Sequence, residues 1–160
     1  MPDSTAEVYL HFVWATKWRE DSIPGDLERD VHRVISVEVR RLGCDVVAIG
    51  GMLDHIHLLV KFGRTVTFAR FMEQIKGVAS AFINDRSPAI LGDTEKMFRW
   101  QPGYGVFSVG PNQVERVIAY IRDQKQHHTE GRIHVAWEPP DAPQPPNSTT
   151  NLPPLSDASP

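Results

Sequence analysis

The segment His55-Ile56-His57 places two imidazoles at the spacing of a strand face. Side chains two residues apart in a β-strand project from the same side of the sheet. The rings of His55 and His57 would therefore lie side by side, with Ile56 directed into the core. Such a pair can share a divalent cation and leave coordination positions for water and substrate oxygens. Two ligands alone do not specify a metal site, so two solvent-facing histidines on a half-exposed strand are the alternative.

Tyr120 and Gln124 are four residues apart in a segment with helical periodicity. This spacing puts them one turn apart on one helix face, at the flank of the apolar stripe. They would then border the sheet rather than point into bulk water. A tyrosine that packs its ring on the helix edge, next to an incidental glutamine, is the alternative, because tyrosines at such boundaries are common.

The periodicity along the chain predicts the elements that position these residues. Residues 7–15 alternate as in a strand. Residues 44–49 and 55–62 form a predicted hairpin, and a fourth strand is expected over residues 106–109. Helices are predicted from Pro24 to Gly43, where a left-handed cap is expected, from Thr67 to Ser87, and over residues 112–127.

This order, βαββαβ plus a helix, predicts an α+β, ferredoxin-like sandwich with a four-stranded antiparallel sheet. The two crossover helices would cover one face of the sheet. The third helix or a second subunit is the expected cover of the other face.

Composition favours one folded domain over residues 1–138 and a disordered tail over residues 139–160. Eight of the 13 prolines lie in that tail, which has almost nothing to bury. Three of the 20 acidic residues and none of the 17 basic ones lie in residues 138–160, so residues 1–137 are formally neutral. That neutrality weakly disfavours nucleic-acid binding. The single cysteine excludes a disulfide framework. Without a long apolar run or a signal peptide, the expected compartment is the cytoplasm.

Five motifs, in order over residues 7–128, resemble the single-tyrosine HUH transposases of the insertion-sequence 200-like group, which include the REP-associated tyrosine transposases. HUH denotes His-hydrophobic-His. The motifs are HFVWATKWR, DHIHLLV, QIKGVAS, WQPGYGVFSV and YIRDQ. Each motif alone is weakly specific, whereas all five in this order are a specific signal.

The resemblance implies a role for each candidate residue. His55 and His57 match the metal-binding pair, Tyr120 the nucleophile and Gln124 the third metal ligand. The implied enzyme cleaves and rejoins single-stranded DNA at hairpin ends through a 5′-phosphotyrosine intermediate. It would use magnesium or manganese and act as a homodimer, in which the tyrosine helix of one subunit can complete the site of the other in trans.

Further side chains are candidates for contacts to DNA or to the metal ligands. Phosphates could contact Lys76, Ser80, Arg122 and Lys125, and bases could stack on Trp100 and Tyr104. Core packing or a solvated position is an alternative for each of these. His11, Asp54, His127 and His128 are candidates to support the metal ligands.

Two other functions fit parts of this pattern. A ferredoxin-like module could bind single-stranded nucleic acid without chemistry, but it would leave the histidines, Tyr120 and Gln124 without a common purpose. A small metal-dependent hydrolase would turn over without a covalent protein–DNA species. Metal-dependent nicking of a hairpin oligonucleotide and capture of a covalent adduct separate the three.

Overall fold

The sheet has four strands in the order β2-β3-β1-β4, and every neighbouring pair is antiparallel. The computed structural model describes residues 4–87 and 97–126. The strands are β1 (Tyr9–Ala15), β2 (Asp45–Met52), β3 (His55–Lys61) and β4 (Gly105–Val109). The predicted strands agree with these to within three residues at each end, and the predicted hairpin is formed by β2 and β3.

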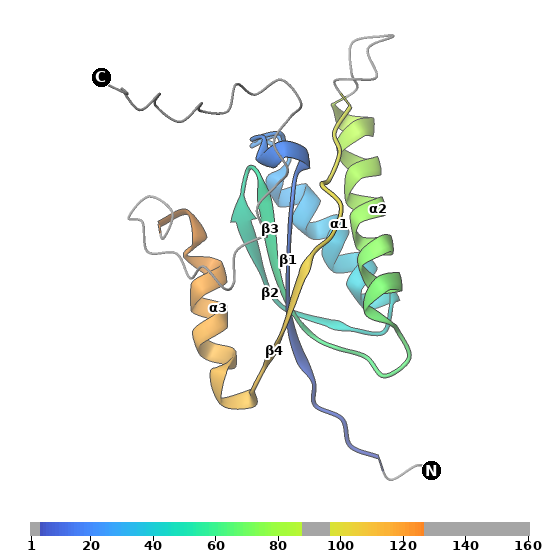
Figure 1. The fold of residues 1–160 in the computed structure, drawn as a ribbon, viewed down its shortest axis with the longest axis vertical. Helices are drawn as coiled ribbons and strands as arrows, with labels where there is room; N and C mark the ends of the chain where they lie inside the picture. The colour runs from blue at the N-terminus through green and yellow to red at the C-terminus, as the bar shows by residue number, and fades with distance from the viewer. Residues whose placement is uncertain (1–3, 88–96, 127–160) are drawn as a thin grey trace, which may run out of the picture.

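Two long helices connect the strands. Helix α1 (Glu28–Arg41) precedes Gly43, whose φ of +78° confirms the predicted left-handed cap. Helix α2 (Phe68–Arg86) begins after Thr67, whose hydroxyl accepts a hydrogen bond from the backbone N–H of Arg70 at 3.2 Å. Both helices lie on the same side of the sheet (Figure 1), which confirms the predicted α+β sandwich.

The alternation of β1 and β3 divides their side chains between two apolar clusters. The larger cluster packs α1 and α2 on the sheet and includes Phe12, Trp14 and Leu58. The smaller cluster lies on the opposite face, where Leu59 packs against Val117 and other residues of the third helix. The sheet is therefore covered on both faces, and the third helix supplies the second cover.

That helix is shorter than predicted. A 3-10 turn, η3 (Pro111–Gln113), leads into α3 (Val114–Arg122), and the chain turns at Asp123 before residues 124–126 are helical again. The expectation that Tyr120 and Gln124 share one uninterrupted helix is therefore wrong. The φ of −97° and ψ of 20° at Asp123 place that residue outside the α-helical range.

The tail over residues 139–160, with His127 and His128, lies outside the described residues. Within the described parts of the chain, no helix is both long and apolar enough to cross a membrane.

Candidate active site

The two histidines of the His-hydrophobic-His segment lie in β3, in the middle of the sheet. In the strand register, His57 is opposite Val13 of β1 and Gly50 of β2. Both histidine side chains are fully buried, at 0% exposure, on the face that α3 covers. The alternative that they face solvent is therefore wrong. Their ring centroids are 5.0 Å apart, so the rings are neighbours, as the strand spacing predicts.

The His57 ring contacts His11 of β1. His11 lies diagonally across the strand pair from His57, and its Nε2 is 2.8 Å from Nδ1 of His57. This contact engages Nδ1, so His57 would coordinate a metal through Nε2. His11 is completely buried and contacts the His57 ring, and its support of a metal ligand stays a prediction.

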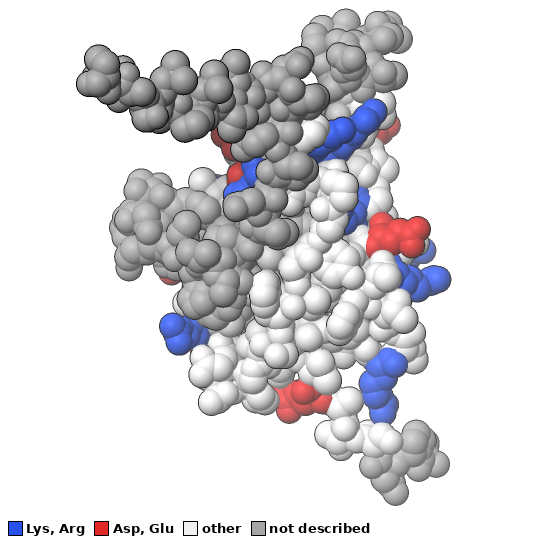
Figure 2. Space-filling view, in the orientation of Figure 1, with Lys and Arg blue, Asp and Glu red and all other residues white. Residues whose placement is uncertain are grey.

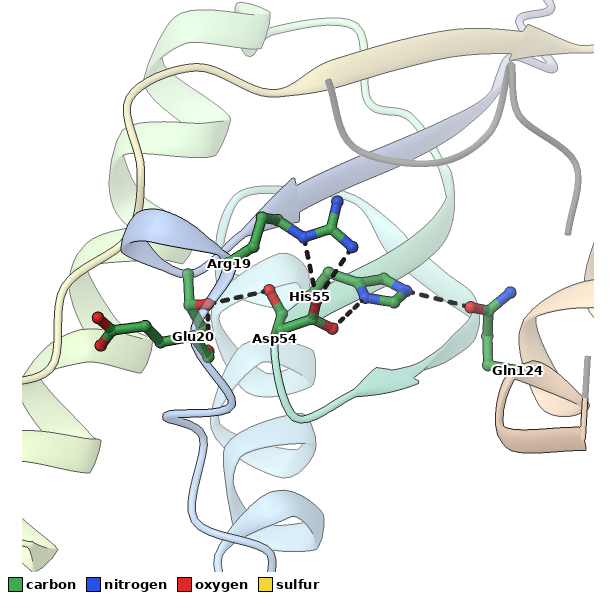
Figure 3. A network of polar contacts seen from close by, with 6 residues as sticks. Arg19, Glu20, Asp54, His55 and Gln124 are labelled. Atoms are coloured by element: carbon green, nitrogen blue, oxygen red, sulfur yellow. Dashed lines mark hydrogen bonds and ion pairs between the residues drawn. The ribbon is translucent and has the colours of Figure 1, made fainter. Parts of the chain in front are cut away.

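The His55 ring lies between two oxygen atoms. Its Nδ1 is 2.6 Å from Oδ1 of Asp54, and its Nε2 is 3.2 Å from Oε1 of Gln124 (Figure 3). The amide of Gln124 is oriented by its own Nε2, which donates to the carbonyl oxygen of Tyr120 at 3.3 Å. A neutral imidazole carries one N–H and cannot donate to both oxygens.

If Nδ1 donates to Asp54, the lone pair of Nε2 on His55 points toward an amide oxygen. A cation accepts both lone pairs. Adjacent ligands on an octahedral ion, with bonds of about 2.1 Å, lie about 3 Å apart, which matches the 3.2 Å between Nε2 and Oε1 of Gln124. Residues 4–87 and 97–126 contain no cluster of three His, Cys, Asp or Glu side chains suited to a metal. Two imidazole nitrogens and one amide oxygen could together hold a divalent cation and leave positions for water or phosphate.

Asp54 connects the His55 ring to Arg19. Its Oδ1 faces His55, and its Oδ2 lies 3.0 Å from both Nε and Nη2 of Arg19 (Figure 3). Burial opposes ionisation of Asp54, but the contacts with His55 and Arg19 outweigh it and lower the pKa from 3.8 to about 2. Asp54 is therefore a carboxylate at neutral pH.

Arg19 reaches Asp54 from a strained turn. The turn η1 (Lys17–Arg19) has Trp18 at φ +60° and Arg19 at φ +55°. Each such non-glycine residue costs about 1–3 kcal/mol and persists only where its surroundings enforce it. The sequence reasoning did not assign a role to Arg19. No glycine or asparagine marks the turn, so the sequence carries no local signal for it.

Tyr120 lies against the histidines from α3. Its ring meets the His57 ring edge to face, with centroids 5.7 Å apart, and the residue is 8% exposed. The other two tyrosines lie elsewhere. Tyr9 donates its hydroxyl to Glu7, and Tyr104 packs against the cluster under α1 and α2. The four residues predicted to act together thus come together within one chain.

The close approach of α3 to β2 depends on Gly50. A Cβ at this position would lie 2.4 Å from the carbonyl oxygen of Ile121, a distance that backbone atoms do not tolerate. Gly50 is opposite His57 in the sheet, so this contact sets how near Tyr120 comes to the imidazoles.

We expect Gly50→Ala to push α3 outward and to lower the free energy of unfolding by about 1–3 kcal/mol. Gly77→Ala on α2 is the matched control, because a Cβ there meets nothing within 4 Å. Helix propensity should make this control more stable by about 0.5–1 kcal/mol. Denaturant unfolding followed by circular dichroism measures both values. Equal effects of the two variants would contradict the close contact.

The predicted DNA-contacting residues have mostly internal contacts. Lys76 donates to the carbonyl oxygens of Gln101 and Gly103, at 2.9 and 3.1 Å, and accepts at its own carbonyl from Trp100 Nε1. Ser80 donates to the carbonyl oxygens of Lys76 and Gly77.

Lys125 pairs with Glu28 at 2.8 Å, Arg122 is exposed, and Tyr104 is partly buried. On the face of the molecule that Figure 2 shows, the Lys and Arg side chains lie apart from one another, among acidic and uncharged residues. A role of these residues in DNA binding stays a prediction.

A sheet with paired histidines beneath a tyrosine-bearing helix defines the class of protein that the sequence resembles. The model of the family described as Transposase IS200 like matches residues 4–124. The chain belongs to this family and is a transposase.

Three curated relatives are also named as transposases. The ISDra2 transposase TnpA of Deinococcus radiodurans is 23% identical over 121 residues, which are 74% of this chain and 84% of the relative. The transposases for insertion sequence element IS200 of Salmonella typhimurium and Salmonella typhi are 26% identical over 125 residues, 76% of this chain and 79% of each relative.

Solved structures share the fold. A putative transposase from Deinococcus radiodurans R1 superposes with a TM-score of 0.62 at 21% identity, over 78% of this chain and 95% of that one. A REP-associated tyrosine transposase bound to a REP hairpin gives a TM-score of 0.57 at 12% identity, over 83% of this chain and 76% of that one.

Proposed function

We propose that this transposase cleaves and rejoins single-stranded DNA at hairpin ends, with Tyr120 as nucleophile and a divalent metal held by His55, His57 and Gln124. The observation that carries the proposal is the arrangement of four side chains. The Tyr120 ring lies on His57 while the Gln124 amide oxygen converges on Nε2 of His55. Family membership and the REP hairpin bound to a structural neighbour support the substrate class.

In the proposed reaction, the hydroxyl oxygen of Tyr120 attacks the scissile phosphorus. The bond from Oη to phosphorus forms as the bond from phosphorus to the 3′ oxygen breaks. The tyrosine loses its proton, and the leaving 3′ oxygen gains one. The product is a 5′-phosphotyrosine linkage and a free 3′-hydroxyl. No water is consumed, so a 3′-hydroxyl can attack the linkage and rejoin the strand.

A tyrosine hydroxyl with its ordinary pKa near 10 is a weak nucleophile, so placement and charge neutralisation must assist it. When bound, magnesium or manganese polarises a non-bridging oxygen of the phosphate. The protein contributes rigid placement, because His55 and His57 are fixed in a central strand. Gln124 is fixed to Tyr120 by its hydrogen bond.

We also propose that the active form is a homodimer, as the resemblance implies. The surface that receives α3 is formed by β2 and β3 around Gly50. Exchange of α3 between two copies would rebuild the same contacts in trans, so the site chemistry is the same in either arrangement.

The test is formation of a covalent adduct by the full chain. A labelled hairpin oligonucleotide with single-stranded flanks is incubated with magnesium or manganese and separated on a denaturing gel. We expect a shifted protein–DNA band that requires metal, is absent in EDTA, and does not form on the fully duplex oligonucleotide. Cleavage without any covalent band would indicate a hydrolase. Tight binding without cleavage over several hairpins would indicate a non-catalytic binding module.

A further inference from the structure

The metal site is proposed to use Nε2 of His55, and the adjacent contacts decide whether that nitrogen can bind. A neutral histidine in water favours the tautomer with the proton on Nε2. In that form, His55 would donate to the amide oxygen of Gln124, which lies 3.2 Å away. Nε2 of His55 and Oε1 of Gln124, the two atoms proposed to bind the metal, would then be joined by a hydrogen bond instead. Something must hold the proton on Nδ1 instead.

The Asp54 carboxylate is placed to do this. Its Oδ1 is 2.6 Å from Nδ1 of His55, and a charged acceptor at that distance holds the N–H strongly. The other oxygen, Oδ2, is occupied by Nε and Nη2 of Arg19, both at 3.0 Å. Each carboxylate oxygen thus has its own partner, and the carboxylate cannot rotate without losing both.

The backbone fixes both members of this pair. The carbonyl oxygen of Asp54 accepts from the backbone N–H of Thr16 at 2.8 Å and from its hydroxyl at 3.2 Å. The chain continues from Thr16 to Arg19 through a turn in which Trp18 and Arg19 both have a left-handed backbone conformation. Such strain persists only where the surrounding contacts enforce it, and one product of this turn is the contact of Arg19 with Asp54.

We propose that Arg19 and Asp54 are a positioning pair that keeps the proton of His55 on Nδ1, so that Nε2 presents its lone pair beside Gln124. This inference rests on the proposed function, which supplies the metal that the lone pair would bind. The tautomer itself is a property of the metal-free protein. Arg19 contacts Asp54, and Asp54 contacts Nδ1 of His55, so the effect of the pair would pass through the His55 ring (Figure 3).

The tautomer is measured on the full chain, labelled with 15N-histidine and free of metal, at about pH 8.5, where an ordinary imidazole is neutral. Long-range 1H–15N correlation distinguishes the two tautomers of each of the seven histidines. His55 is assigned as the ring whose signals His55→Gln removes. We expect Nδ1–H in the wild type and Nε2–H in Asp54→Ala. Asp54→Asn should also give Nε2–H, because Arg19 holds the amide oxygen and leaves the NH2 group to donate to Nδ1 of His55.

Manganese binding is measured on the same proteins by calorimetry. Affinity should fall about 10- to 100-fold in Asp54→Ala and Asp54→Asn, as for other groups that orient metal-binding histidines, and less in Arg19→Gln. Arg41→Gln is the matched control, because it breaks an arginine–carboxylate pair with Glu38 at 3.0 Å on α1. This control should change neither tautomer nor affinity.

Nε2–H on His55 in the wild type would overturn the positioning pair, as would an unchanged tautomer in folded Asp54→Ala. If Asp54→Ala does not fold, Arg19→Gln decides through manganese affinity, which must fall relative to Arg41→Gln. A wild type with the Asp54-dependent tautomer but no manganese binding would support the pair and refute the metal site. The two proposals can therefore fail separately.

Discussion

Tyr120→Phe is expected to form no covalent adduct with DNA while binding a hairpin oligonucleotide almost as tightly as the wild type. The substitution removes one oxygen and keeps the ring that packs on His57. That oxygen is the bond-forming atom in the proposed reaction, so the loss should be complete. Affinity should persist because it comes from phosphate and stacking contacts elsewhere. A denaturing gel with labelled hairpin and manganese measures the adduct, and fluorescence anisotropy measures binding.

Stability provides the first control on this result. Loss of one hydroxyl should change the free energy of unfolding by no more than about 1 kcal/mol. Tyr104→Phe is the second control, since Tyr104 packs with the cluster on the other face of the sheet and should keep full adduct formation. An adduct that persists in Tyr120→Phe would move the nucleophile to Tyr104 or Tyr9.

The second large effect is expected from His57→Ala, which should abolish most metal binding and DNA cleavage. The variant removes one of two imidazoles and also the partner of His11. We expect manganese affinity to fall by at least about 100-fold. Loss of a group that only orients a ligand lowers affinity about 10- to 100-fold, and loss of the ligand itself should cost no less than the upper value. Calorimetry measures the affinity, and gel analysis under limiting manganese measures cleavage.

His57 is fully buried, so its removal should also cost about 2–5 kcal/mol of stability. Leu58→Ala separates this effect from loss of a ligand. Leu58 is equally buried in the same strand, but it faces α1 and α2 rather than α3. It should lower stability to a similar extent and keep manganese binding. Full cleavage by His57→Ala at limiting metal would refute the ligand assignment.

The fold was predictable because the apolar residues of each strand and helix recur with the period of that element. Alternation marked the strands, and helical spacing marked α1 and α2. Thr67 and Gly43 marked a helix start and a helix end, and the structure has both at those positions. The short connection between the two β-rich runs was sufficient for the hairpin. These are local signals, and they do not depend on knowing the tertiary structure.

The contacts around the histidines depend on strand register, which no local signal fixes. His11 reaches His57 only because β1 pairs with β3 so that His11 lies opposite Leu59. A shift of one residue would turn His11 into the other face. The burial of the histidines depends on how closely α3 packs at Gly50. The turn that presents Arg19 has a backbone that its residue types disfavour.

Tyr120 and Gln124 are joined by a hydrogen bond and follow one another within five residues of chain. On the proposed roles, the nucleophile and one metal ligand therefore arrive and depart together, while both histidines stay in the sheet. A displaced α3 would leave neither a competent cation site nor a tyrosine to attack. On these roles, DNA cleavage requires a fully docked α3, because docking supplies the nucleophile and the third metal ligand in a single step.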